Sequence, residues 1–203
     1  MNTMSSQTPS PLPPSSSAAP PAVLFPFSER SLRLQREVAR FVEDKVLPAE
    51  AEFAAHAADP ARRWTIPPVL ESLKATARAQ GLWNLFLPPG ALPADVADAG
   101  APGTGLSNLD YAPIAELTGR SLHAPEVFNC SAPDTGNMEV LLHFATPEQR
   151  APWLPRLLAG EIRSAFAMTE PDVASSDATN IALPIVRDGD ELVIHGRKWW
   201  TTG

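Results

Sequence analysis

Apolar side chains recur at intervals of three and four residues after position 28, the spacing that places them on one face of a helix. The first stripe consists of Leu32, Leu34, Val38, Phe41, Val42 and Val46. Ser28 precedes this stripe and is a suitable N-cap, whereas Pro48 should interrupt or kink the helix because proline has no backbone N–H. The pattern predicts a long helix that resumes over 49–58 and stops at the turn Asp59-Pro60.

Further helices are predicted from the same spacing and from residues that favour helix ends. Gly81 should end the second helix, because glycine readily takes the left-handed conformation found there. The expected helices run from Pro67-Pro68 to Gly81, from Ser107 or Asn108 through an i,i+4 pair of Glu116 and Arg120, and from Gly136 to Phe144. The apolar segment 82–87 should be buried, 88–105 should be a surface loop, and 121–134 should contain only short turns.

The clearest local signal is the start of a short helix at Thr146. Thr146-Pro147-Glu148-Gln149 combines an N-cap threonine, a proline at the first helical position and a glutamine that can close a capping box. The sequence predicts a helix there with a break near Pro152 or Pro155, ending at Gly160.

After Gly160 the apolar spacing becomes that of strands. The segments 164–168, 181–186 and 192–194 are short apolar or β-branched runs, and the last two are joined across the hairpin dipeptide Asp188-Gly189. A further strand is expected near the end of the chain, at 198–203. Helices followed by strands predict an α+β chain or two domains, and so few strands would form a small sheet with exposed edges.

The composition narrows the class of protein. The chain has 203 residues, a net charge of −7, one cysteine and no apolar run long enough to span a bilayer, so we expect no nucleic-acid partner and no membrane span. Residues 1–27 are rich in serine, proline and alanine and are predicted to be a disordered tail without a secretory or transit signal. Together with the single cysteine, this favours a cytoplasmic location.

Two stretches carry the candidate chemistry, 166–177 and 198–203. They combine aromatic rings, side-chain hydroxyls and a loop of small residues through which backbone N–H groups can approach a ligand. These groups suit a flat heterocycle with polar edges and a phosphate tail.

The order of elements and these two motifs resemble the acyl-CoA dehydrogenase family over about 28–203. Phe166 followed by Thr169-Glu170-Pro171 and Ser176-Asp177 is similar to the end of the family's first strand, and Lys198-Trp199-Trp200-Thr201-Thr202 is similar to its Lys-x-Trp-Ile-Thr element. The segment Asp172–Ser175 is one residue longer than the common Gly-Ala-Gly form. The resemblance implies a helical domain at 28–162 and the first strands of an antiparallel β domain at 163–203, with the chain truncated before the family's C-terminal helical bundle.

The resemblance also implies FAD-dependent α,β-dehydrogenation of a fatty acyl-CoA thioester to the trans-2-enoyl-CoA. An electron-transferring flavoprotein is the expected acceptor, and a homodimer or homotetramer is the expected assembly. By analogy, Met168 and Thr169 would bond the polar edge of the flavin, Trp200 would pack on its ring, and Thr202 would donate near N5. The expected cofactor-binding residues are Phe166, Met168, Thr169, Ser175, Ser176, Trp200, Thr201 and Thr202. Ser176, favoured over Ser175 because it precedes Asp177, would face the flavin phosphates or the acyl-CoA substrate.

No catalytic residue is assigned within the chain, because the family's base is a carboxylate of the C-terminal bundle. Glu170 is interpreted as a structural carboxylate and Cys130 as an inert thiol, and the histidines lack metal-ligand spacing. The isolated chain is therefore expected to be inactive. Two alternatives remain at this stage, a non-catalytic interaction module of the same fold and an acyl-CoA oxidase-like flavoenzyme.

Overall fold

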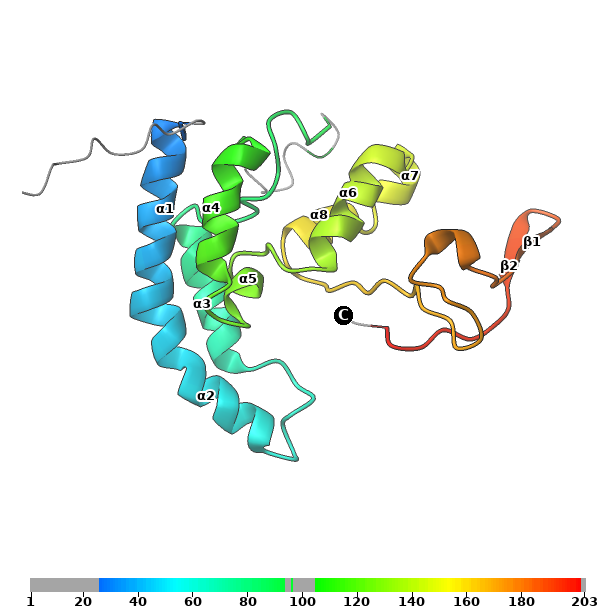
Figure 1. Ribbon diagram of the computed structural model, residues 1–203, viewed down its shortest axis with the longest axis horizontal. Coiled ribbons are helices and arrows are strands. Elements are labelled where there is room, and N and C mark those ends of the chain that lie inside the picture. The colour runs from blue at the N-terminus through cyan, green and yellow to red at the C-terminus, as the bar shows by residue number, and fades with distance from the viewer. Residues whose placement is uncertain (1–25, 94–95, 97–104, 202–203) are drawn as a thin grey trace, which may run out of the picture.

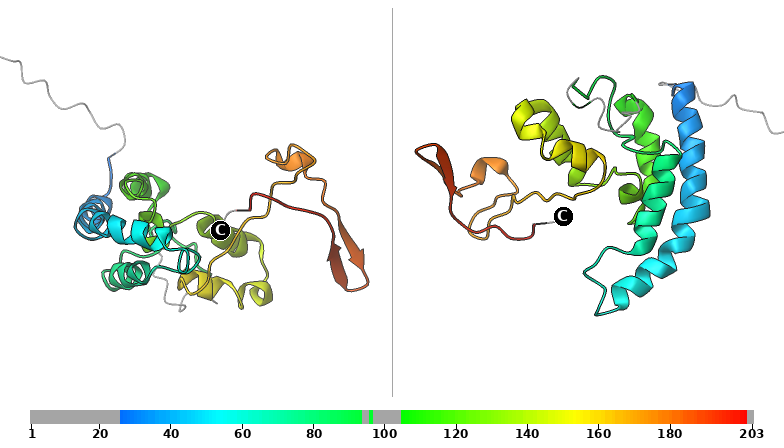
Figure 2. Two further views of the ribbon diagram at one scale, coloured as in Figure 1. Left: turned by 90° about the horizontal axis from the view of Figure 1, so that it is seen from below. Right: turned by 180° about the vertical axis from the view of Figure 1, so that it is seen from behind.

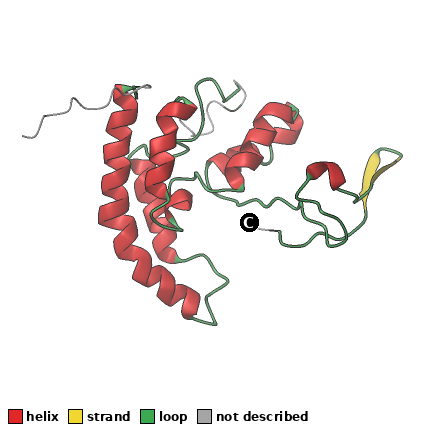
Figure 3. Cartoon of the chain, viewed as in Figure 1, coloured by secondary structure: helices red, strands yellow, loops and turns green. Residues whose placement is uncertain are grey.

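Helices lie between Glu29 and Leu158, and a small sheet follows them (Figures 1 and 3). The structure is a computed structural model that describes residues 26–93, 96 and 105–201, so most of the expected tail at 1–27 and part of the expected loop at 88–105 lie outside the described residues. The elements are α1 (Glu29–Phe41), the π-helical η1 (Val42–Val46), α2 (Leu47–Ala58), α3 (Pro68–Ala79), α4 (Asn108–Thr118), α5 (Ala124–Val127), α6 (Asp134–Phe144), α7 (Pro147–Arg150), α8 (Leu154–Leu158), the 3-10 turn η2 (Ala178–Asn180), β1 (Ile185–Asp188) and β2 (Glu191–Ile194).

The long first helix is confirmed, and its irregularity lies just before Pro48. Ser28 caps α1 by accepting a hydrogen bond from the Ser31 N–H. Because Pro48 has no N–H and its ring crowds the preceding turn, residues Val42–Val46 widen into a π-helix, and the Leu47 N–H reaches back to the Val42 carbonyl. Leu32 is 41% exposed and is not part of the buried stripe. A helix rotates by more than half a turn over two residues, so Leu32 and the buried Leu34 lie on opposite faces of α1.

Gly81 ends α3 as predicted. It has φ of +72°, its N–H donates to the Arg78 carbonyl, and the Leu82 N–H donates to the Ala77 carbonyl, which together form a Schellman motif. This turn directs the segment 82–87 into the interior, where it is buried as predicted.

The ion pair predicted within α4 is wrong. Arg120 lies beyond the end of α4 and pairs with Glu43 at 2.6 Å, so it links this end of α4 to the π-helical segment rather than to Glu116. The connector 121–134 holds the single-turn helix α5 in addition to turns.

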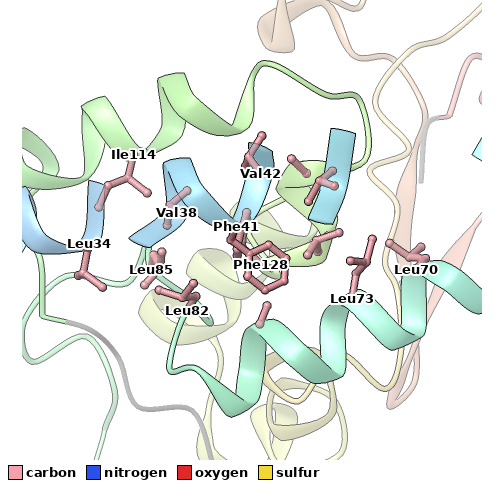
Figure 4. Packing of buried hydrophobic residues seen from close by; sticks show 14 of the residues in the cluster. Leu34, Val38, Phe41, Val42, Leu70, Leu73, Leu82, Leu85, Ile114 and Phe128 are labelled. Carbon is pink, nitrogen blue, oxygen red and sulfur yellow. The ribbon is translucent and has the colours of Figure 1, made fainter. Parts of the chain in front are cut away.

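The main core lies between α1, α3, α4 and α5. The ring of Phe128 packs edge-to-face on Phe41 with centroids 5.2 Å apart. Figure 4 shows side chains from these helices, from η1 and from the segment 82–87 packed together with that pair, and they include Leu34, Val38, Val42, Leu70, Leu73, Leu82, Leu85 and Ile114. The burial of aliphatic and aromatic side chains, rather than helix propensity alone, holds these helices together.

A second cluster joins α6 and α8 to the segment 86–87. Its buried members are Phe86, Leu87, Val96, Met138, Leu142, Leu154, Leu157 and Leu158. Two buried asparagines beside it, Asn84 and Asn129, are hydrogen-bonded to each other and to the carbonyl of Leu158, to which the Trp83 indole also donates at 2.8 Å. These bonds satisfy the end of α8 and therefore fix where the chain leaves the helical domain.

The capping box of α7 is confirmed. The Gln149 N–H donates to the Thr146 hydroxyl at 3.3 Å, and the Thr146 N–H donates to the Gln149 side chain at 2.9 Å. The predicted break also occurs, since α7 stops at Arg150 and α8 starts at Leu154.

The sheet is smaller than the sequence predicts. β1 and β2 form an antiparallel hairpin with Asp188 opposite Glu191, closed by Gly189 and Asp190, and Figure 2 shows that this hairpin projects away from the helices. The strands predicted at 164–168 and 198–203 are not formed within the described residues, which end at 201, apart from a single bridge at Phe166. Residues 181–184 also stay outside β1, because the N–H groups of Ala182 and Leu183 donate to the Glu170 carboxylate instead of to a neighbouring strand.

Candidate functional site

The two motifs singled out in the sequence lie against each other in space. The Trp199 N–H donates to the Thr169 carbonyl at 3.0 Å, and the Lys198 ammonium donates to the Met168 carbonyl at 2.8 Å. These contacts join positions about thirty residues apart in the chain, and they hold the segment 198–201 beside the segment 166–170. Figure 1 shows both segments running between the helices and the hairpin.

The Glu170 carboxylate holds these segments together through hydrogen bonds. It is 7% exposed and accepts hydrogen bonds from the Lys198 ammonium at 2.8 Å and from the N–H groups of Ala182 and Leu183 at 2.9 and 3.0 Å. The Lys198 bond is the main cause that holds the pKa of Glu170 below its ordinary value, and the backbone donors act in the same direction. A carboxylate that is ionised and already bonded to three donors is a structural group, in agreement with the sequence interpretation.

A hollow of about 250 Å³ opens where the two segments meet the start of α6. It is lined by Ala132, Pro133, Phe166, Met168, Thr169 and Trp200. The Trp200 ring is 82% exposed, and in the described part of the chain neither the N–H nor the hydroxyl of Thr169 has a hydrogen-bond partner. The hollow therefore offers a bare aromatic face together with free donors.

Trp200 is held in an unusual backbone conformation. Its φ is +53°, in the left-handed region that bulky residues seldom occupy. The neighbouring Trp199 ring packs edge-to-face against it with centroids 6.4 Å apart. Such conformations occur where the surrounding structure constrains the chain, and they are frequent at binding sites.

The two serines have different environments. The Ser175 hydroxyl is buried and accepts the Glu170 N–H at 2.5 Å, so it stabilises the turn after Thr169. Ser176 is exposed, and Asp177 closes the next turn by accepting from the Thr179 N–H at 3.0 Å. Only Ser176 of this pair presents its side chain to solvent, and its role as a ligand contact stays a prediction.

The remaining predicted residues are only partly brought together. Phe166, Met168, Thr169 and Trp200 share the hollow, whereas Ser175 and Ser176 lie in the next turn and line no part of it. Thr201 is exposed, and Thr202 lies outside the described residues.

A further group, not identified from the sequence, positions the segment that leads to Phe166. The N–H and hydroxyl of Ser164 both donate to Asp134 on α6, at 2.7 and 2.6 Å, and the Arg163 guanidinium pairs with the same carboxylate and with Glu126. Asp134 is 3% exposed. The only sequence signal was an acidic residue in the first turn of a helix, which does not reveal a partner thirty residues away.

The other reactive groups that the structure describes form no second site. Burial raises the pKa of the Cys130 thiol to about 11, so little thiolate forms near neutral pH. Among the described residues, no group of three or more His, Cys, Asp or Glu side chains could hold a metal ion, and none of the residues that line the hollow is acidic. None of the helices in the described ranges is both long and apolar enough to cross a bilayer.

The fold defines the chain as an α+β protein with a helical domain followed by two antiparallel strands, and comparison with known proteins identifies the family. The sequence model described as acyl-CoA dehydrogenase, N-terminal domain, matches residues 28–161. The chain belongs to the acyl-CoA dehydrogenase family. Its helical domain followed by two antiparallel strands agrees with the fold of that family.

The chain is similar to several proteins of this family. It is 51% identical to acyl-CoA dehydrogenase family member 11 of Gallus gallus over 89% of this chain and 22% of that protein. It is 50% identical to a Mycobacterium tuberculosis protein assigned as acyl-CoA dehydrogenase FadE2, over 88% of this chain and 41% of that one.

A solved structure shows the same likeness in three dimensions. A Mycobacterium abscessus protein assigned to the acyl-CoA dehydrogenases superimposes with a TM-score of 0.79 at 53% identity, covering 88% of this chain and 44% of that one. The chain thus spans less than half the length of each of these relatives.

Proposed function

We propose that this chain supplies one wall of the FAD site of an enzyme that oxidises a fatty acyl-CoA to its trans-2-enoyl thioester. The observation that carries the proposal is the convergence of the two motifs on one hollow, where the exposed Trp200 ring lies beside Thr169 donors that have no hydrogen-bond partner among the described residues. Family membership supports the oxidoreductase class.

The residues present fit one side of a flavin. Trp200 would pack on the ring system, while the Thr169 N–H and hydroxyl would donate to its polar edge, because aromatic stacking and directed donors are what a flat heterocycle with carbonyl edges requires. The Met168 N–H already donates to the Phe166 carbonyl and its carbonyl accepts from Lys198, so Met168 would exclude water together with Phe166 instead of bonding the polar edge. Thr201 and Thr202 would follow Trp200 along the ring. When bound, FAD would supply the hydride acceptor.

The chain's own residues would bind and orient rather than abstract the proton. None of the described residues that line the hollow is acidic, and Glu170 is already engaged by three donors. The exposed Ser176 would face the flavin phosphates or the acyl-CoA, and the buried Ser175 would support that turn. The same proposal divides the chain into domains at 28–162 and 163–203. It includes an electron-transferring flavoprotein as the electron acceptor and a homodimer or homotetramer as the assembly.

Flavin binding tests the first part of this proposal. FAD is titrated into the purified chain while flavin and tryptophan fluorescence are recorded. Trp200→Ala should weaken binding about tenfold or more, because the substitution removes the ring face. Trp64→Ala is the matched control, since Trp64 is 91% exposed and lies in the loop between α2 and α3. Equal affinity of wild type and Trp200→Ala would contradict the assignment.

A measurement of acyl-CoA turnover tests the second part of the proposal, that the chain binds and orients without abstracting the proton. The isolated chain should bind FAD without reducing a dye in the presence of acyl-CoA, because it places no carboxylate at the hollow within its described residues. Acyl-CoA-dependent dye reduction by the chain alone would show that it contains a base.

A further inference from the structure

We propose that Lys198 is a positioning residue that prepares the Met168–Thr169 peptide to donate a hydrogen bond to the bound cofactor and favours the cofactor's reduced form. This inference rests on the proposed function, since it concerns the same hollow. The inference assigns a role to Lys198, which does not line the hollow and acts through its hydrogen bond to the Met168 carbonyl.

The contacts of Lys198 place a positive charge behind the wall of the hollow. Its ammonium donates to the Met168 carbonyl and to the Glu170 carboxylate, both at 2.8 Å, and its side chain is 20% exposed. The two acceptors are two residues apart, so a single ammonium bridges the turn that carries Thr169. Charge-assisted hydrogen bonds of this kind are stronger than those between neutral groups, which fixes the turn.

The Met168 carbonyl and the Thr169 N–H belong to the same peptide group. A cation bonded to the oxygen withdraws electron density from that group, and the N–H becomes a stronger donor, because consecutive hydrogen bonds polarise one another. Thr169 lines the hollow, and its N–H has no partner in the described part of the chain. The polarised donor is therefore available to a ligand.

A donor strengthened in this way favours whichever ligand state carries more negative charge. Reduction adds electron density to a flavin, so the reduced form should gain more from the Thr169 N–H than the oxidised form does. Glu170 offsets part of the Lys198 charge, but its carboxylate is also bonded to the N–H groups of Ala182 and Leu183. The carbonyl bond remains a direct link between Lys198 and the hollow.

The chain provides a matched control in Arg197. It carries the same charge and is the adjacent residue, but it is exposed and makes no hydrogen bond to Met168 or Glu170. Any effect of net charge alone should be reproduced by Arg197→Met, whereas an effect of the carbonyl bond should not.

The first measurement needs no cofactor. In proton–nitrogen NMR spectra of the chain, Lys198→Met should move the Thr169 amide proton to lower chemical shift, because the peptide loses its polarising partner. Lys198→Arg should keep most of the wild-type shift, and Arg197→Met should leave it unchanged. Lys198→Gln keeps a donor without charge and should fall between Lys198→Arg and Lys198→Met, and it replaces Lys198→Met if that variant does not fold by circular dichroism.

The second measurement uses the FAD-loaded protein. Lys198→Met should weaken binding of reduced FAD relative to oxidised FAD by about tenfold, which lowers the two-electron midpoint potential by about 30 mV. Lys198→Arg should restore most of that potential. A purely structural role would lower the unfolding temperature of Lys198→Met without a shift in potential.

The outcomes separate this inference from the proposed function. If wild type does not bind FAD, the proposed function fails, while the NMR series still decides whether Lys198 polarises the peptide. If wild type binds FAD but Lys198→Met leaves both the Thr169 amide shift and the potential unchanged, or if Arg197→Met changes them equally, the role of Lys198 is overturned.

Discussion

At the scale of single residues, Gly160 shows how one position fixes the path of the chain toward the site. It has φ of +66°, and a Cβ at this position would lie 2.7 Å from the Trp83 ring. The ring cannot move away easily, because its indole N–H is bonded to the Leu158 carbonyl. Glycine at 160 therefore lets the chain leave α8 in this direction without a clash against the Trp83 ring.

Gly160→Ala should destabilise the protein by about 1–3 kcal/mol, because a β-carbon overpacks the contact with Trp83. Urea unfolding followed by tryptophan fluorescence measures this loss. Gly90→Ala is the matched control, since Gly90 also has a positive φ, +69°, and nothing lies within 4 Å of the position where its β-carbon would be. Equal stability of Gly160→Ala and wild type would show that the Trp83 ring can give way.

Glu170 makes the stability of the site region depend on pH. Because its pKa in the folded chain lies below the ordinary value of 4.5, the unfolded chain binds more protons as the pH falls past 4.5. The stabilisation by Glu170 is therefore complete above this value and is lost as the pH falls through its folded pKa.

The difference in thermal stability between wild type and Glu170→Gln should accordingly be constant near neutral pH and shrink below about pH 4.5. Thermal unfolding across this range, recorded for both proteins, measures the difference. A stability difference that does not change with pH would mean that the charge of the Glu170 carboxylate contributes nothing to stability.

At the scale of elements, local sequence and distant contacts act together. α7 begins where its own residues dictate, since the capping box lies within Thr146–Gln149. The segment 181–184, in contrast, has the β-branched and aliphatic character of a strand but is diverted by the Glu170 carboxylate. An element forms as its propensity suggests only when its backbone groups have no better partner nearby.

Thr146→Ala should remove the cap of α7 and cost about 1 kcal/mol. Hydrogen exchange of the Gln149 amide should accelerate, because that N–H loses its acceptor. Thr146→Ser keeps the hydroxyl and should exchange like wild type. Slow exchange at Gln149 in the alanine variant would mean that another group caps this helix.

At the scale of the whole molecule, two apolar clusters join the helices. Phe128 belongs to the first and is fully buried against Phe41, and Tyr111 and Cys130 pack against both clusters. The helical domain is therefore continuous from α1 to α8, whereas the hairpin lies apart from it with both strands exposed (Figure 2).

Phe128→Ala should cost about 3–5 kcal/mol, because it removes a buried ring and leaves a cavity in the main core. Phe144→Ala is the control, since Phe144 is 82% exposed and its removal should change stability by less than about 0.5 kcal/mol. Chemical unfolding of both variants gives the comparison, and similar losses would show that Phe128 is not central to the core.

The sequence by itself determined the features that depend on near neighbours. The N-cap at Ser28, the Gly81 terminus, the capping box at Thr146 and the hairpin turn at Gly189 were all predictable, because their hydrogen bonds and backbone angles involve residues only a few positions apart. The family motifs at 166–177 and 198–201 were recognisable for a related reason, since they are contiguous patterns.

Only the tertiary structure decided how distant segments meet. Arg120 pairs with Glu43 and Asp134 holds Ser164, and neither partner is marked by spacing in the chain. The expected strands at 164–168 and 198–203 depended on finding partner strands, whereas Lys198 donates to the Met168 carbonyl and Glu170 accepts from the N–H groups of Ala182 and Leu183. Hydrogen bonds between distant residues depend on where packing brings the chain, and a one-dimensional pattern does not contain that information.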